Sequence, residues 1–276
     1  MGRVTGAGGS RLAFRTAGDP QGPPIVFVHG WAASGAAWSG QLSDPALAGH
    51  RLVAVDLRGH GASDVPADGY DRPEVWAGDL AAVLDHCRAA TGLPPVLVGW
   101  SYGGLVVTDY LRERGTAGIA GVVYAGALTE VGRDRPGGVI GPAWDGIMRP
   151  ALSDDPEDAI PALTTLARRM TAAPLPGADV QRYVGDMLRV PPSVRKALFR
   201  RDVGSAEVLA AIDVPVLVAH GTADTVVAPA SAEYTAGKIS TAVVRWFEEV
   251  GHMPFVERRA EFNAALLEFA GPVANH

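Results

Sequence analysis

Five short apolar segments, spaced along the chain and separated by helical patterns, constrain the fold more than any other feature of the sequence. Each segment lacks the alternation of apolar and polar residues, and together they cover residues 25–28, 52–55, 96–98, 122–124 and 216–218. Such segments suit strands that are buried on both faces, as in a parallel sheet covered by helices.

Helical patterns lie between several of these segments. In residues 73–92 the apolar side chains recur near one stripe of a helix, at Val75, Leu80, Val83, Leu84 and Cys87. A second helical pattern starts at residue 103 and stops at Gly115. The alternation of strand and helix predicts an α/β fold with a mostly parallel sheet, and the glycine turn within residues 4–18 predicts an antiparallel hairpin at its edge.

The strand signal disappears between residues 128 and 212, where helical pieces rich in Arg, Met and Pro take over. We therefore expect a core domain formed by residues 1–127 and 213–276, with residues 128–212 inserted after the sixth strand as a helical cap. Within the cap, Ser153 is expected to cap the helix that begins at DDPEDAIPAL. The cationic run Arg195, Lys196, Arg200 and Arg201 is expected to form a solvated helix face.

Charge and cysteine content exclude several classes of function. The chain has 24 Lys+Arg against 30 Asp+Glu, a net charge of −6, which disfavours nucleic acid as a partner. The single cysteine, Cys87, excludes an internal disulfide framework and a multi-cysteine metal site. No apolar stretch approaches about 18 residues, which argues against a membrane partner. The N-terminus shows no signal sequence, so a cytoplasmic location is expected.

The segment GWSYG, residues 99–103, places Ser101 between two glycines. It follows the apolar strand PPVLV and opens the helical pattern GGLVVTDYL, which is the setting of a nucleophile elbow. Glycines are required there because side chains would collide where the helix doubles back over the strand. The sequence therefore predicts that Ser101 is a nucleophile in a strained backbone conformation.

A serine nucleophile needs a base, and the base needs a group that fixes its tautomer. Asp224 and His252 each follow a predicted strand, and the order Ser, Asp, His is the order of this type of triad. Glu248 and Glu249 are rival carboxylates because they lie near the histidine in sequence. We expect structural roles for the turn residues His29 and His60 and for His220 at a strand end, and no metal site.

Acyl transfer also needs donors aimed at the developing oxyanion. The segment VFVHGWAASG leaves a strand at His29 and Gly30, so the N–H of Trp31 can meet that of Tyr102 above the serine. The side chains that we expect to line the substrate pocket are Trp31, Tyr102, Trp144, Met148, Met170, Met187, Phe199 and Met253.

Four signatures stand in order: HGW at 29–31, DLRGHGASD at 56–64, GWSYGG at 99–104, and HGTAD at 220–224 with GHMPFVE at 251–257. With these the chain resembles the α/β-hydrolase fold superfamily over essentially its whole length, in particular small serine esterases and cofactor-free haloperoxidases. The resemblance implies a Ser101–Asp224–His252 triad, an oxyanion role for the Trp31 and Tyr102 amides, and a helical cap.

Two details separate the chain from other members of the superfamily. Strong perhydrolases tend to carry a proline soon after the first HG and a Met after the nucleophile, whereas this chain has HGWAAS and Tyr102. Epoxide hydrolases and haloalkane dehalogenases of this fold use an aspartate nucleophile, so Ser101 argues against both.

The sequence thus predicts a serine hydrolase that cleaves a small-molecule carboxylic ester or lactone through an acyl-enzyme, with no cofactor. Four alternatives use the same site: a cofactor-free perhydrolase or haloperoxidase, a C–C bond hydrolase, a biosynthetic cyclising enzyme, and a slow-turnover ligand-binding protein.

Overall fold

A single eight-stranded sheet organises the chain. The computed structural model describes residues 1–273, and its strands follow the order β1-β2-β4-β3-β5-β6-β7-β8. The strands are β1 (Gly2–Thr5), β2 (Arg11–Gly18), β3 (Pro24–Val28), β4 (Arg51–Val55), β5 (Val96–Trp100), β6 (Gly121–Ala125), β7 (Val216–Gly221) and β8 (Ala242–Phe247).

The sheet is parallel from β4 to β8 and antiparallel only at the N-terminal hairpin. β1 pairs antiparallel with β2, and β2 pairs antiparallel with β4, so the hairpin forms one edge of the sheet. The five expected apolar segments lie in β3, β4, β5, β6 and β7, and every residue of β3, β5, β6 and β7 is buried. The predicted fold class is therefore confirmed: burial on both faces explains the unbroken apolar segments.

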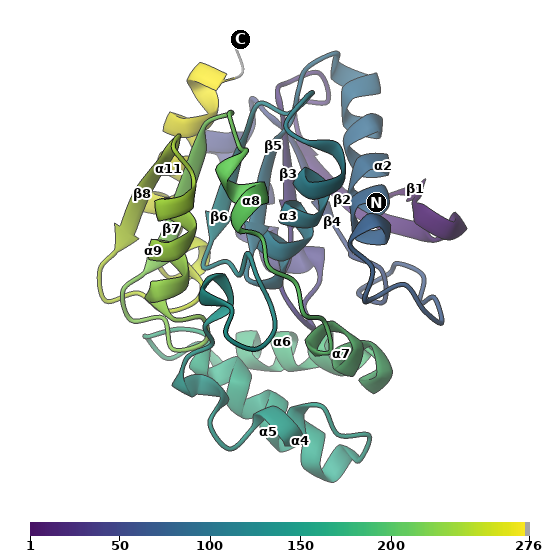
Figure 1. Cartoon of the computed structure of the whole chain (residues 1–276), viewed down its shortest axis with the longest axis vertical. Helices are drawn as coiled ribbons and strands as arrows, with labels where there is room; N and C mark the ends of the chain where they lie inside the picture. Colours follow the sequence, from purple (N-terminus) through teal and green to yellow (C-terminus); the bar gives the residue numbers. More distant parts are fainter. Residues whose placement is uncertain (274–276) are drawn as a thin grey trace.

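Helices cover both faces of the sheet (Figure 1). One face carries α2 (Pro73–Thr91), α3 (Tyr102–Arg114), α8 (Ala206–Ala210) and α9 (Pro229–Lys238), and the other carries α1 (Ser39–Leu42), α10 (Pro254–Glu257) and α11 (Arg259–Val273). Both predicted helix ends are glycines: α2 stops before Gly92, which adopts φ 71°, and α3 stops before Gly115, which adopts φ 66°. Short 3₁₀ turns occur at Ala7–Gly9, Gly35–Trp38, Pro45–Leu47, Pro136–Gly138 and Pro142–Trp144.

The segment between β6 and β7 forms a separate helical layer across one end of the sheet (Figure 1). It contains α4 (Met148–Ala151), α5 (Pro156–Arg169), α6 (Gly177–Arg189) and α7 (Pro192–Phe199). The next helix, α8, lies inside the range expected for the cap but packs against α3 and α9 on the sheet. The helices that cover the sheet end therefore finish with α7. Residues 274–276 of the expected core segment lie outside the described residues.

The cap for α5 is Asp155 and not Ser153. The Asp155 carboxylate accepts the N–H of Glu157 at 2.9 Å, while the Ser153 hydroxyl accepts the N–H of Asp155 and forms a turn just before the helix. Pro156 explains the difference, because its fixed φ suits the first helical position and leaves the residue before it as the cap.

The expectation of a solvated cationic face is wrong for two of its four residues. Arg195 and Arg201 are each only 3% exposed, whereas Lys196 pairs with Asp154 near the surface. Arg201 donates to both carboxylate oxygens of Asp109 on α3, at 2.7 and 2.9 Å, and neither side chain of this pair is exposed. Arg201 also donates to the Tyr102 hydroxyl at 3.1 Å. The ion pair therefore joins the end of the cap to the helix that starts beside Ser101.

Breaking this ion pair from one side should destabilise the fold strongly. Replacing Arg201 by Met leaves the Asp109 carboxylate buried without its partner, which is expected to cost about 3–5 kcal/mol of unfolding free energy. Adding Asp109→Asn removes the orphaned charge, so the double variant should be more stable than R201M alone. Urea unfolding of R201M, the double variant and the wild type measures this, and a double variant no more stable than R201M would contradict it.

Candidate active site

Ser101 sits at a strained turn between β5 and α3. Its backbone adopts φ 54° and ψ −124°, a region that residues other than glycine rarely occupy. The flanking glycines allow close backbone contact: a Cβ on Gly103 would lie 2.4 Å from the Val28 carbonyl oxygen, and one on Gly99 would lie 2.8 Å from the Gly103 carbonyl oxygen. The elbow expected from the sequence is therefore present, and the Ser101 side chain stands at the end of the sheet.

Asp224 and His252 meet at the same end of the sheet. Asp224 follows β7, His252 follows β8, and Asp224 Oδ2 lies 2.8 Å from His252 Nδ1. Glu248 and Glu249 are both exposed, and Glu248 accepts instead from the Thr222 hydroxyl at 3.3 Å. Of the three carboxylates considered in the sequence, Asp224 is therefore the one that contacts the histidine.

Both oxygens of the Asp224 carboxylate accept hydrogen bonds. Its Oδ1 accepts the N–H groups of Val226 and Val227 at 2.8 and 3.0 Å. Burial alone would raise the pKa of this carboxyl, but the positive charge available on His252 and hydrogen bonds from His220 and His252 hold the pKa below its ordinary value. The lowered pKa favours the charged form of Asp224, which can orient the imidazole and stabilise its protonated form.

The histidine ring is held by its neighbours. Trp100 Nε1 donates to the His252 carbonyl oxygen at 3.0 Å, and the two rings are 5.4 Å apart. A Cβ on Gly126 would lie 3.2 Å from His252 Nδ1, and its φ of 50° also favours glycine. Because Nδ1 faces Asp224, Nε2 is the ring nitrogen that does not contact the carboxylate. Among residues 1–273 no hydrogen bond joins Ser101 Oγ to His252 Nε2; such bonds often tighten only when substrate binds.

The loop after β3 brings a backbone turn against the serine. A Cβ on Gly30 would lie 2.8 Å from Ser101 Cβ, so only glycine permits this approach. His29 Nδ1 donates to the Gly30 carbonyl oxygen at 2.8 Å, because its Nε2 accepts the Leu57 N–H at 3.0 Å. His29 thus holds the peptide group between Gly30 and Trp31, which also contains the Trp31 N–H. Tyr102 is the first residue of α3, where helical N–H groups have no partner within the helix.

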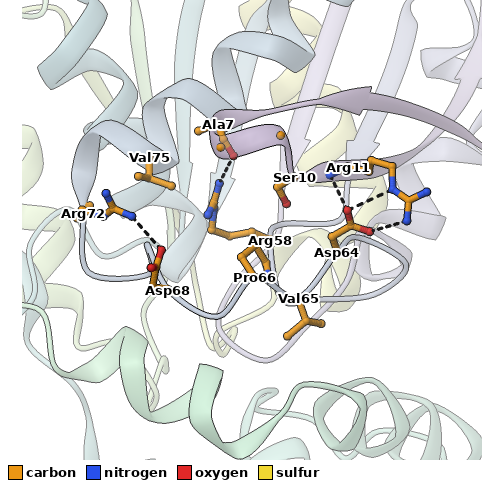
Figure 2. A pocket seen from close by; sticks show the side chains of 12 residues that line it. Ala7, Ser10, Arg11, Arg58, Asp64, Val65, Pro66, Asp68, Arg72 and Val75 are labelled. Atoms are coloured by element: carbon orange, nitrogen blue, oxygen red, sulfur yellow. Dashed lines mark hydrogen bonds and ion pairs between the residues drawn. The ribbon is translucent and has the colours of Figure 1, made fainter.

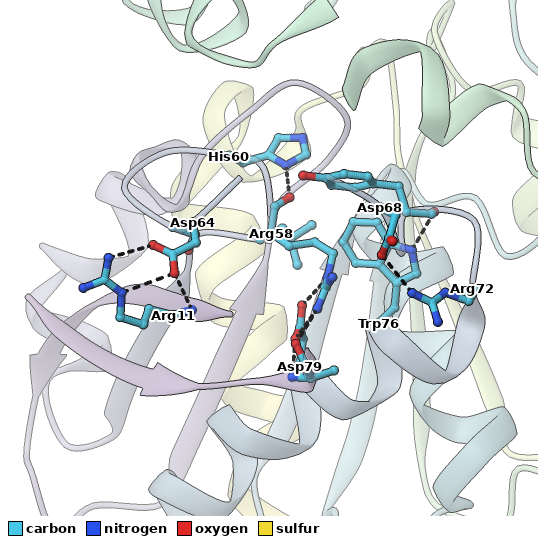
Figure 3. Close-up of polar contacts among 12 residues, drawn as sticks. Arg11, Arg58, His60, Asp64, Asp68, Arg72, Trp76 and Asp79 are labelled. Carbon is cyan, nitrogen blue, oxygen red and sulfur yellow. Dashed lines mark hydrogen bonds and ion pairs between the residues drawn. The ribbon is translucent and has the colours of Figure 1, made fainter. Parts of the chain in front are cut away.

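Residues 56–64 contact the region after β3 through hydrogen bonds. Asp56 accepts the Gly35 N–H at 2.7 Å and the Ala62 N–H at 2.9 Å, so one carboxylate links two loops. Arg58 pairs with Asp79 on α2 at 2.6 Å, and His60 Nδ1 donates to the Arg58 carbonyl oxygen at 2.8 Å (Figure 3). The structural roles expected for His29 and His60 agree with these contacts.

A cavity of about 620 Å³ opens beside this segment, between the first 3₁₀ turn and the start of α2 (Figure 2). None of the predicted site residues lines it. Its arginines are all paired, Arg11 with Asp64, Arg58 with Asp79 and Arg72 with Asp68, so they neutralise one another within the protein. The cavity lies outside the Ser101 site.

Three of the expected pocket residues form an aromatic cluster under the cap. The rings of Trp31, Trp144 and Phe199 lie 5.4 Å from one another in all three pairs. Trp31 Nε1 donates to the Arg195 carbonyl oxygen at 3.1 Å, which fixes the cluster to α7. The cluster therefore connects the loop after β3, next to Ser101, with the cap.

The other expected pocket residues occupy different places. Met170 lies at the histidine, since its carbonyl oxygen accepts the His252 N–H at 2.9 Å, and Met253 and Met187 are buried. Met148 lines a cavity of about 800 Å³ at the start of α5, together with Asp154 and Lys196. The Tyr102 ring is only 1% exposed, and its hydroxyl donates to the Leu198 carbonyl oxygen at 3.3 Å. Tyr102 thus anchors α7 to α3.

Sequence reasoning missed two residues that contact the site. His220 Nε2 lies 3.2 Å from Asp224 Oδ2, although only a strand-end role was expected for it. Glu257 accepts the Gly251 N–H at 2.8 Å and the Ala172 N–H at 2.9 Å, and so ties the histidine loop to the loop after α5. The spacing of His220, four residues before Asp224 at the end of a strand, was the available signal for the first; the second is the last residue of the GHMPFVE signature, but its contacts with Gly251 and Ala172 were not expected.

Comparison with known proteins identifies the family. A model of the alpha/beta hydrolase family matches residues 25–265, and the chain belongs to this family. A solved esterase from Rhodococcus sp. ECU1013 is 39% identical, with a TM-score of 0.91 over 99% of this chain and 98% of that chain. An esterase from Exiguobacterium antarcticum is 27% identical, with a TM-score of 0.86 over 98% and 100% of the two chains. A non-heme chloroperoxidase of Streptomyces lividans is 30% identical over 98% of this chain and 99% of its own length.

Two further observations concern metals and membranes. Within residues 1–273, no three His, Cys, Asp or Glu side chains are grouped so as to hold a metal ion. No helix in the same range is long and apolar enough to cross a membrane.

The two buried histidines under the site should make the fold sensitive to acid. Burial, together with the nearby His29, lowers the pKa of His60 from 6.5 to about 3, and burial also lowers the pKa of His29. The unfolded chain therefore binds more protons than the folded one below about pH 6.5, and stability falls as the pH drops toward 3. Between pH 7.5 and 4.5, His60 alone should account for about 2.6 kcal/mol of lost unfolding free energy.

The control for this prediction is His60→Asn, whose amide can still donate to the Arg58 carbonyl oxygen but cannot titrate. Urea unfolding at several pH values should give a smaller loss of stability for H60N than for the wild type. Equal pH dependence in the two proteins would rule out His60 as a source of the acid sensitivity.

Proposed function

We propose that this chain is a serine hydrolase that cleaves a small-molecule carboxylic ester or lactone. The observation that carries the proposal is the convergence at one sheet end of a strained, glycine-flanked serine and a buried Asp–His pair with a 2.8 Å contact. Ester cleavage is the activity in the names of the two solved relatives, one of them 39% identical.

In the proposed reaction, Ser101 Oγ attacks the carbonyl carbon while His252 Nε2 takes the hydroxyl proton. Asp224 holds Nδ1 and stabilises the imidazolium that forms. The Trp31 and Tyr102 N–H groups receive the developing oxyanion, an interaction worth about 10²–10³ in rate for each donor. His252 then gives its proton to the departing alkoxide, and water releases the acyl group by the same route. No step requires a cofactor.

The substrate would be a compact ester with an apolar portion. Ser101 is only 8% exposed and His252 only 2%, so the cap leaves little open surface above the serine. The Trp31, Trp144 and Phe199 cluster offers aromatic surface next to the proposed oxyanion donors. Aromatic walls bury apolar groups efficiently, and the ester carbonyl is held by polar groups at the end of the pocket.

Ser101→Ala is the direct test of this proposal. Removing the nucleophile should lower kcat for a short-chain aryl ester by about 10⁴-fold or more and should abolish covalent labelling by a fluorophosphonate. Ser240→Ala, which makes the same change at an exposed position after α9, serves as the matched control and should react like the wild type. Retention of either turnover or labelling in S101A would refute the assignment.

Perhydrolysis is a second candidate, favoured by the chloroperoxidase relative that matches 98% of the chain. In that reaction peroxide, and not water, would attack the same acyl-enzyme. The residue after Ser101 argues for hydrolysis, because strong perhydrolases tend to have Met at this position. Here the position is Tyr102, and its hydroxyl is held by contacts with Leu198 and Arg201.

A peroxide competition separates the two candidates. Bromination of a phenol in the presence of acetate, hydrogen peroxide and bromide should remain well below the rate of aryl ester hydrolysis in the wild type, and S101A should lose both activities. A bromination rate that rivals ester hydrolysis would make perhydrolysis the primary function.

A further inference from the structure

His220 occupies an unusual place beside the proposed triad. It is the fifth of the six residues of β7, and its side chain has no exposed surface. Its Nε2 lies 3.2 Å from Asp224 Oδ2 and 3.1 Å from the Val227 carbonyl oxygen. Its Nδ1 is buried and has no hydrogen-bond partner among the described residues.

These contacts determine which nitrogen of the His220 ring carries the proton. A carboxylate oxygen and a carbonyl oxygen can only accept, so the nitrogen between them must carry the hydrogen. Nδ1, which faces no acceptor, is the natural position for the unprotonated nitrogen. His220 is therefore an N–H donor that is shared between Asp224 and the backbone of the loop after β7.

The His220 N–H contacts the same Asp224 oxygen that contacts His252, the proposed base. Asp224 Oδ2 is shared by His252 Nδ1 at 2.8 Å and His220 Nε2 at 3.2 Å, while Oδ1 is occupied by two backbone N–H groups. We propose that His220 is a positioning residue for the Ser101–Asp224–His252 site: it fixes the rotation of the Asp224 carboxylate and withdraws negative charge from the oxygen bound to His252. This inference rests on the proposed hydrolase function.

The proposal predicts two separable effects of losing the donor. Without it, Asp224 Oδ2 carries more negative charge toward His252, so the base binds its proton more tightly. The titratable groups that contact Asp224 are His220 and His252, and the His220 ring packs on its other side against Trp246, which does not titrate. The carboxylate also gains freedom to rotate, which lowers the fraction of time that the imidazole is correctly oriented.

His220→Gln and His220→Asn form a matched pair of tests. The Gln amide nitrogen can reach the position of His Nε2, whereas the Asn amide is shorter and falls at the position of Nδ1. For H220N we expect kcat on an aryl ester about tenfold lower, KM changed by less than about twofold, and the acidic limb of the kcat/KM profile moved up by about 0.5 pH unit. H220Q should keep kcat and the acidic limb close to those of the wild type.

Three outcomes would overturn the proposal: both variants behaving like the wild type, both losing activity equally, or H220N losing activity with no movement of the acidic limb. The second and third would indicate only a structural role. If the variants do not fold, nitrogen-15 NMR of the wild-type imidazoles decides: a proton on His220 Nε2 supports the proposal, and a proton on Nδ1 contradicts it.

A separate measurement isolates this inference from the proposed function. Fluorophosphonate labelling of the wild type at Ser101 is carried out first. Failure to label refutes the hydrolase assignment itself, whereas normal labelling with identical pH profiles for H220N and H220Q refutes only the role of His220.

Discussion

The candidate site depends on the hydrogen bonds that the buried Asp224 carboxylate accepts. It lies where β7 ends, and its two oxygens accept from the backbone of its own loop, from His220 and from His252. A carboxylate in such a place remains charged only because every lone-pair direction is used, since burial by itself would favour the neutral acid. The histidine loop after β8 is thereby tied to the neighbouring strand, and this contact fixes the orientation of the His252 ring.

A second constraint acts at the serine and is purely steric. The positive φ of Ser101 and the contacts of less than 3 Å that a Cβ on Gly30, Gly99 or Gly103 would make show three backbone segments packed against one another. Side chains at these positions would force β3, β5 and α3 apart. The strain at Ser101 is therefore maintained by the surrounding sheet, and it keeps the hydroxyl at the tip of the turn.

The cap is attached to the core by polar contacts that also surround the site. Arg201 pairs with Asp109 on the helix that starts beside the serine, and the Ser34 hydroxyl donates to Asp186 on α6 at 2.9 Å. Glu257 links the loop after α5 to the histidine loop. These contacts hold the cap and the core together beside Ser101 and His252.

The sequence by itself determined the strands, the elbow and the Ser–Asp–His order. Unbroken apolar segments, glycines at fixed offsets and strand-end loops are local signals, and each depends on backbone sterics and burial that a short segment already specifies. Only the tertiary structure decided which groups meet across long separations: the choice of Asp224 over Glu248 and Glu249, the burial of Arg201 against Asp109, and the contact of His220 with Asp224. These depend on the placement of whole strands and helices, because a hydrogen bond or ion pair requires atoms about 3 Å apart and charge or residue type alone does not report that distance.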